Sequence, residues 1–329
     1  MVSAEASQAT VAGRKRLRED SEGVESPPKK IRQQEDVREG KEEEEEEDEE
    51  AMEPCTKFKF RTTAIRDLKV VWNALTKLPN IEFVFFTFEP KVVRFHAQPK
   101  QSPSIVSSYW NPLQFSDFYV EKPVTFAVSK ARLEHMKGQL ESTVEFVEFV
   151  NVGEDDETRG FVMRGEFLHK KTSTKSRFNL LVADRDTGGV LGLIDPSDFV
   201  YHLHFAVNSQ VFKDSVGFMD TANGTLQIKV KDTLLTLSGI NMDYAMAMEN
   251  FFIELTSPVP EEVCVMLPKN YIDVIRKAVD ISPSLEISFN TENLANDIAS
   301  PVCFRFEFGE RTQDQSYLEF VIMPNVDNS

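Results

Sequence analysis

The chain has few cysteines and no long apolar run, and both absences restrict its class. Cys55, Cys264 and Cys303 are odd in number and lack CxxC spacing, which argues against a disulfide framework and against a zinc site. This cysteine usage fits a reducing compartment. No apolar stretch approaches the ~18 residues that a membrane-spanning helix needs, and the polar N-terminus does not resemble a signal peptide. We therefore expect a soluble intracellular protein that has no membrane partner.

The sequence also lacks the common motifs of enzymes, since it contains no GxGxxG, GxxxxGK[ST], HExxH or GxSxG pattern. His202 and His204 alternate along a predicted strand, but no third Cys, His or carboxylate stands at ligand spacing. We interpret that strand as amphipathic and partly solvated, and we expect no metal ion and no cofactor. Paired acidic residues such as Asp155 and Asp156 lie in polar loops, which is typical of solvated turns rather than of acid/base pairs. We expect no catalytic residue.

Residues 1–56 are poor in apolar side chains, so they cannot bury enough surface to offset chain entropy, and we expect a disordered tail. The tail holds 9 basic and 18 acidic residues, a net charge of −9 out of −17 for the whole chain. Two basic clusters resemble a bipartite nuclear-import signal, which predicts a nuclear protein; a solvated charge run is the alternative. The cluster residues are Arg14, Lys15, Arg16, Arg18, Lys29, Lys30 and Arg32. The acidic run Glu42–Glu50 should stay extended.

From residue 57 the chain reads as two segments, 57–183 and 199–329, each with short strands and two helices. The predicted helices begin near Ile65, at residue 130 after the N-cap Ser129, at residue 208, and after Pro268. Between the segments, 184–198 (DRDTGGVLGLIDPSD) contains two adjacent glycines and a proline, which favours an extended connecting segment.

The two segments also repeat one another. Residues 124–130 match 263–269 at an offset of 139, and beyond them Met136 falls on Ile275 and Lys137 on Arg276. The first helix of each segment matches more weakly at an offset of 144, with Trp72 on Val216. This period is too long for a solenoid unit and indicates a duplicated domain.

Basic residues recur on all four predicted helices, away from the apolar stripe of each. For one helix a solvated face is the ordinary explanation, but four such helices in an acidic chain favour a shared positive lining suited to phosphate backbones. No aromatic residues interleave, so base stacking on single strands is not indicated. The candidate DNA-binding residues are Arg66, Lys69, Lys77, Lys130, Arg132, Lys137, Lys213, Lys269, Arg276 and Lys277.

Taken together, residues 57–326 resemble a DNA sliding clamp of the proliferating-cell-nuclear-antigen type. Residues 68–78 (LKVVWNALTKL) resemble the first channel-facing helix of that family, and Leu191–Ile194 resemble its interdomain connecting loop. Residues 300–302 and 321–326 resemble the proline before the penultimate strand and the terminal strand with its Pro-containing extension. The resemblance implies an α+β fold of two tandem clamp domains, each with curved antiparallel sheets and two helices.

The resemblance further implies a homo-oligomeric ring, usually of three subunits, that pairs edge strands and surrounds double-stranded DNA. The expected partners are a DNA polymerase, a clamp loader, and peptide-motif-bearing replication or repair proteins. A partner peptide would dock beneath the connecting segment, although these apolar residues could instead pack on the second sheet. The candidate pocket residues are Leu191, Leu193, Ile194, Pro301, Pro324 and Val326.

Four features differ from the common cellular clamp: the long N-terminal tail, the loop 98–104, the segment 153–159, and an acidic C-terminal tail that is reduced to residues 327–329. They favour a divergent viral processivity factor over the alternative of a checkpoint-type clamp subunit, or hetero-oligomeric scaffold, that recruits DNA-repair factors.

Overall fold

The computed structural model describes residues 58–100, 102–140, 143–155, 160–169, 175–182, 194–219, 224–239, 242–253, 261–292, 300–309 and 315–324. All of them belong to one compact unit, Glu53–Ser329. The import-like clusters and the acidic run therefore lie outside the described residues. The predicted domain boundaries at 56, 183 and 198 stay predictions.

The first half of the unit contains nine strands and two helices in the described part of the chain. They are β1 (Phe58–Thr62), α1 (Ile65–Lys77), β2 (Phe83–Glu89), β3 (Val92–Ala97), β4 (Ile105–Trp110), β5 (Asp117–Val120), β6 (Val124–Ser129), α2 (Lys130–Gly138), β7 (Val144–Asp155), β8 (Gly160–His169) and β9 (Lys175–Val182). A short 3-10 turn, η1 (Pro112–Gln114), precedes β5.

The second half has the same order of strands and helices, again within the described ranges. Its elements are β10 (Leu203–Asn208), α3 (Ser209–Phe218), β11 (Thr225–Lys231), β12 (Leu234–Ser238), β13 (Asp243–Ala247), β14 (Asn250–Ile253), β15 (Glu262–Pro268), α4 (Lys269–Ala278), β16 (Ser284–Phe289), β17 (Val302–Phe308) and β18 (Ser316–Ile322). The 3-10 turns η2 (Pro196–Asp198) and η4 (Val279–Ile281) precede β10 and follow α4. The repeated strand–helix pairs β6–α2 and β15–α4 fall where the sequence repeat placed them.

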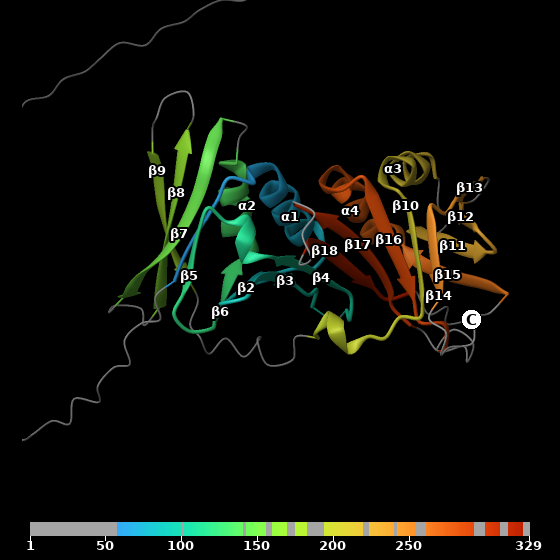
Figure 1. Cartoon of the computed structure of the whole chain (residues 1–329), viewed down its shortest axis with the longest axis horizontal. Helices are drawn as coiled ribbons and strands as arrows, with labels where there is room; N and C mark the ends of the chain where they lie inside the picture. Colours follow the sequence, from blue (N-terminus) through green and yellow to red (C-terminus); the bar gives the residue numbers. More distant parts are fainter. Residues whose placement is uncertain are drawn as a thin grey trace, which may run out of the picture. The chain divides into compact units, whose positions relative to one another are not determined.

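The strands form three antiparallel sheets in which the duplication is visible (Figure 1). One half contributes the order β5-β1-β7-β8-β9, and the other contributes the equivalent order β14-β10-β16-β17-β18. Likewise, β4-β3-β2-β6 in the first half corresponds to β13-β12-β11-β15 in the second. The nine-stranded sheet arises because β18 pairs with β4. This pairing joins the five strands of the second half to the four strands β4-β3-β2-β6 of the first half in one continuous sheet.

This seam leaves the equivalent partners unpaired. Strand β9 corresponds to β18 and β13 corresponds to β4, yet β9 pairs with β8 alone and β13 with β12 alone among the described strands. Among the described strands, β9 and β13 are therefore two unpaired sheet edges that match the two edges joined internally. Unpaired N–H and C=O groups of such edges are ready to pair with another strand.

Alternating strands and amphipathic helices build the core. Strand β1 buries Phe58 and Phe60 and turns Lys59 and Arg61 outward. The Phe60 ring stacks on Phe149 of β7 at 4.7 Å between centroids, and Phe149 in turn meets the edge of Trp72 at 6.0 Å. Trp72 thereby fixes α1 on the sheets.

The four helices begin close to their predicted positions. Ser129 accepts a hydrogen bond from Arg132 N at the start of α2, and Asn208 accepts from Gln210 N and Val211 N at the start of α3. Helix α1 ends at Lys77, just before Pro79. Among the described residues, no helix is long and apolar enough to cross a membrane.

Candidate nucleic-acid interface and connecting segment

The four helices form one row in the order α2, α1, α4, α3, with each helix in contact with the next (Figure 1). Helices α1 and α2 belong to the first half and α3 and α4 to the second, so the α1–α4 contact crosses between the halves. Each helix faces its sheet with an apolar stripe. Leu68, Trp72 and Leu75 are buried on α1, and Ile272 and Ile275 are buried on α4.

The candidate DNA-binding side chains lie on these helices at different degrees of exposure. Five are exposed: Arg66, Lys69, Lys77, Arg132 and Lys277. Five are partly buried: Lys130, Lys137, Lys213, Lys269 and Arg276. The row therefore gathers ten cationic side chains along adjacent helices; whether they contact DNA stays a prediction.

Helices α1 and α2 hold a cluster of lysines around Lys137. Its Nζ donates to Thr76 Oγ1 at 3.1 Å and to Asn73 Oδ1 at 3.3 Å, so α2 is tied to α1. Burial lowers the pKa of Lys137, and the charges of Lys77, Lys130 and Lys69 lower that pKa further, against an opposing contribution from Glu134. Four lysines from two helices thus share one local field.

The second half places two carboxylates, Asp280 and Asp273, among the cations. Lys213 Nζ of α3 lies 3.1 Å from Asp280 Oδ1 in η4, and Arg66 Nη2 of α1 donates to the Asp280 main-chain oxygen at 2.9 Å. On α4, Asp273 Oδ1 lies 3.1 Å from Lys269 Nζ and 3.8 Å from Arg276 Nε. A cavity of about 380 Å³ beside Arg66 and Asp280 is also lined by Ser209, at the start of α3.

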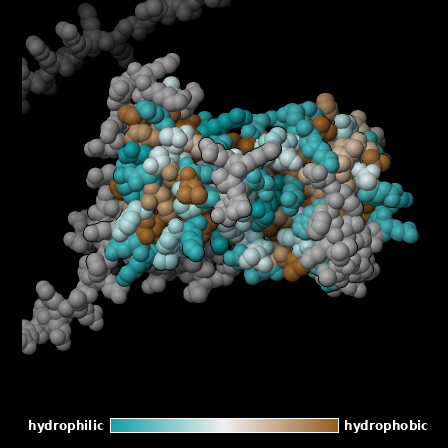
Figure 2. Space-filling view, in the orientation of Figure 1, coloured by the Kyte–Doolittle hydropathy of each residue, from teal (hydrophilic) through white to brown (hydrophobic). Residues whose placement is uncertain are grey.

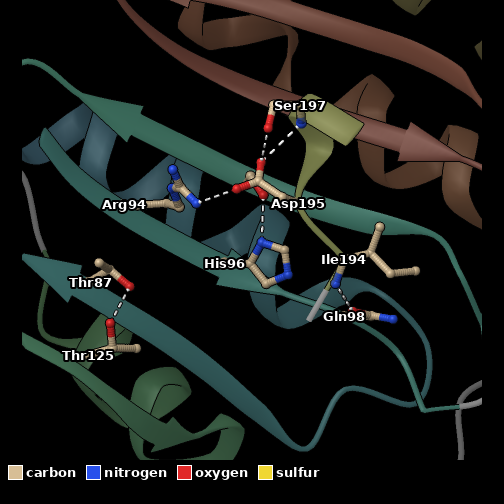
Figure 3. Close-up of polar contacts among 9 residues, drawn as sticks. Thr87, Arg94, His96, Gln98, Thr125, Ile194, Asp195 and Ser197 are labelled. Atoms are coloured by element: carbon tan, nitrogen blue, oxygen red, sulfur yellow. Dashed lines mark hydrogen bonds and ion pairs between the residues drawn. The ribbon is translucent and has the colours of Figure 1, made fainter. Parts of the chain in front are cut away.

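The described end of the connecting segment is fastened to β3 (Figure 3). Asp195 Oδ2 accepts from Arg94 Nη1 at 3.1 Å, while Asp195 Oδ1 accepts from the Ser197 amide at 3.0 Å. Ile194 N donates to the Gln98 side chain at 3.2 Å. Burial raises the pKa of Asp195, but the bonds from Ser197 and Arg94 outweigh it and leave that pKa below its ordinary value.

The candidate peptide pocket is only partly described. Ile194 and Pro324 are half-buried, whereas Pro301 is buried. Leu191, Leu193 and Val326 lie outside the described residues. Their pocket role stays a prediction.

Two polar features of β3 and the strands beside it were not predicted from the sequence. His96 of β3 is buried, with Nδ1 2.7 Å from Ser107 Oγ. Burial, reinforced by the Arg94 charge, lowers the pKa of His96 to about 4. The residue is therefore a neutral histidine inside a strand pair at physiological pH.

The second feature is a stack that crosses the seam between the halves. The Arg94 guanidinium lies 4.6 Å from the Tyr109 ring, which stacks on Tyr317 at 4.5 Å between centroids. Arg305 covers the other side of Tyr317 at 3.8 Å. These residues come from β3, β4, β18 and β17, so the stack supports the β4–β18 pairing.

The two histidines that alternate near β10 have different surroundings. His202 precedes the strand and is buried, while His204 Nδ1 lies 2.9 Å from Ser288 Oγ and 3.6 Å from Glu286 Oε1. Within the described ranges, no group of three His, Cys, Asp or Glu side chains is arranged to hold a metal ion.

Large apolar side chains are exposed on and around α3 and β13. They are Val211, Phe218, Leu234, Met242 and Tyr244, and Phe218 keeps 71% of its surface accessible. Apolar residues on the face drawn in Figure 2 lie scattered among hydrophilic ones. Apolar side chains scattered singly over a surface are common in proteins, so these residues do not by themselves mark a contact site.

Comparison with solved structures shows which known fold this chain resembles. No protein-family model and no curated protein sequence matches the chain. The structure is similar to the crystal structure of PCNA from Thermococcus kodakaraensis, with a TM-score of 0.62 and 13% sequence identity over 82% of this chain and 100% of that chain. The predicted α+β fold of the sliding-clamp type is thereby confirmed.

Proposed function

We propose that this chain is a non-enzymatic sliding clamp, a processivity factor that surrounds or grips double-stranded DNA and tethers a DNA polymerase. The observation that carries the proposal is the helix row. Two tandem copies of one fold place four adjacent helices, with ten cations, on a scaffold similar to PCNA. Contacts of this kind attract phosphates without reading sequence, and a ring need not bind tightly to stay on DNA.

Self-association is part of the proposal, and the two unpaired edges support it. Because β9 is equivalent to β18 and β13 to β4, a β9–β13 pairing between two copies would repeat the pairing that already joins the halves within one chain. Such a head-to-tail contact is heterologous, so it generates a ring when the rotation closes. We propose a homotrimer, following the family resemblance. A checkpoint-type clamp subunit would instead pair these edges with different chains.

The connecting segment is the proposed docking site for partners. A polymerase peptide bound there would convert each polymerase dissociation into rapid rebinding, because tethering raises the local concentration. The proposed partners also include a clamp loader and other replication or repair proteins. The import-like clusters favour a nuclear site of action, and the long acidic tail favours a viral processivity factor.

The DNA contact is tested by removing cations that have no acidic partner. Lys69 and Lys130 make no ion pair with any residue that the structure describes. Replacing both with alanine should weaken binding of the full chain to a short linear duplex. The slope of log affinity against log salt should fall by about 2, since each phosphate contact contributes about 0.9. Fluorescence anisotropy of a labelled duplex measures both quantities.

A matched control replaces Lys91 and Lys122, two exposed lysines in strand-connecting turns rather than on the helices. The control has the same charge change and should keep the wild-type slope. Equal slopes for the helix variant and the wild type would refute the helix row as the DNA-binding surface.

A further inference from the structure

Three carboxylates lie on the helix row or directly beside it and form ion pairs with its cations. Glu134 of α2 lies 3.5 Å from Lys77, and Asp280 of η4 lies 3.1 Å from Lys213. Asp273 of α4 contacts both Lys269 and Arg276, at 3.1 and 3.8 Å. Within the described ranges, the candidate DNA-binding side chains Lys77, Lys213, Lys269 and Arg276 therefore already have an acidic partner.

These contacts link neighbouring helices as well as charges. Glu134 and Lys77 join α2 to α1, and Asp280 touches Lys213 of α3 through its carboxylate and Arg66 of α1 through its main chain. The acidic groups therefore recur along the length of the row. They remain accessible: the side chains of Glu134 and Asp280 are 38% and 54% exposed. Ion pairs this exposed are weak and open readily.

We propose that Glu134, Asp273 and Asp280 are built-in counterions that compete with DNA phosphates for the helix cations and thereby limit how tightly the protein grips the duplex. The proposal rests on the function proposed above. Affinity for DNA arises largely from counterions released when phosphates are neutralised. A lysine that must first separate from its carboxylate gains less binding free energy when it neutralises a phosphate, because the internal ion pair is lost and no counterion is released.

The consequence for the mechanism is a weak static grip. Lys69, Lys130 and Lys277 make no ion pair with any described residue and would supply the contacts present at every position along the DNA. Lys77, Lys213, Lys269 and Arg276 would exchange between a phosphate and their carboxylates. Exchange of this kind lowers the barrier to sliding, because each lost phosphate contact is replaced by an internal one.

The test neutralises all three carboxylates in the full chain, as Glu134→Gln, Asp273→Asn and Asp280→Asn together. A control carries the same charge change in strands β2, β5 and β17, as Glu89→Gln, Asp117→Asn and Glu307→Gln. Binding to a short linear duplex is measured by anisotropy from 50 to 200 mM salt. Thermal unfolding, followed by circular dichroism, checks that both variants fold.

The helix variant should bind more tightly than the wild type, and its salt slope should steepen by about 2 to 3, since each additional phosphate contact adds about 0.9. Its advantage over the wild type should therefore shrink by about 15- to 60-fold between the two salt concentrations. The control should keep the wild-type slope.

The outcomes separate this inference from the function on which it rests. If the wild type binds with a clear salt slope but the helix variant has the same slope, or the control steepens equally, the counterion role is overturned and the clamp function stands. If the wild type shows no salt-dependent binding to duplex DNA, the clamp function itself fails and the counterion role falls with it.

Discussion

Replacing Ala245 with proline should weaken self-association of this chain while leaving β13 folded. Met248 N donates to Thr233 O, and Met242 O accepts from Gly239 N, so the even-numbered residues of this segment point their backbone groups toward β12. Successive strand residues point their N–H groups to opposite sides. The Ala245 N–H therefore points away from β12, to the unpaired edge, and proline removes that donor without breaking the internal ladder.

The magnitude follows from the internal seam. Strands β18 and β4 pair over five residues, from Tyr317–Tyr109 to Val321–Ile105, and an equivalent contact between copies would have a similar extent. A proline in its middle removes one hydrogen bond and leaves a covered carbonyl without a donor, which costs about 1–3 kcal/mol. Each contact should weaken by about 5- to 150-fold, since 1.4 kcal/mol is tenfold.

Light scattering coupled to gel filtration, over a dilution series, measures the mass. The wild type should remain oligomeric at concentrations where Ala245→Pro dissociates, and an Ala245→Val control should behave as the wild type. An identical dilution profile for the proline variant would show that β13 is not the contact. A wild type that is monomeric throughout would refute edge pairing between identical chains.

Two further predictions concern stability. Trp72 is fully buried between α1 and the sheets, so Trp72→Ala should lower the free energy of unfolding by about 3–5 kcal/mol in urea titrations. The control Lys69→Ala, on the exposed side of α1, should change that free energy by at most about 0.5 kcal/mol. Comparable losses for the two variants would contradict the assigned orientation of α1. The folded-state pKa of His96, about 4, lies below the ordinary 6.5, so the unfolded chain binds more protons between these values and stability falls as pH falls. Between pH 8 and 5 this histidine should account for a loss of about 2 kcal/mol in the free energy of unfolding. In His96→Gln, the free energy of unfolding should therefore fall by about 2 kcal/mol less over this pH range than in the wild type. Parallel pH profiles of wild type and variant would show that His96 is not buried in its neutral form.

Much of the local structure could be predicted because its causes are local. The apolar stripes of the helices predicted where α1 and α2 begin, and Ser129 was predicted as the N-cap of α2. The repeat at offset 139 anticipated that β6–α2 and β15–α4 are equivalent pairs. These signals depend on side chains a few residues apart, which a single sequence contains in full.

The candidate interface was predicted in composition but not in its electrostatics. Nothing in the sequence indicated that Lys213 would meet Asp280, 67 residues further along the chain, or that Arg66 would reach the Asp280 main chain, 214 residues away. The same holds for the fastening of Asp195 to Arg94. A charge that looks free along a helix can have its partner on a distant element.

The sequence by itself therefore determined the strands, the four amphipathic helices and the duplication, because propensity, periodicity and capping act within a few residues. Only the tertiary structure decided that β18 pairs with β4, that β9 and β13 are left as the matching unpaired edges, and that the helices line up as α2, α1, α4 and α3. The physical reason is that strand pairing and helix contact join residues up to about two hundred positions apart. Main-chain hydrogen bonds between strands do not depend on side-chain identity, so a sequence does not show which strand pairs with which.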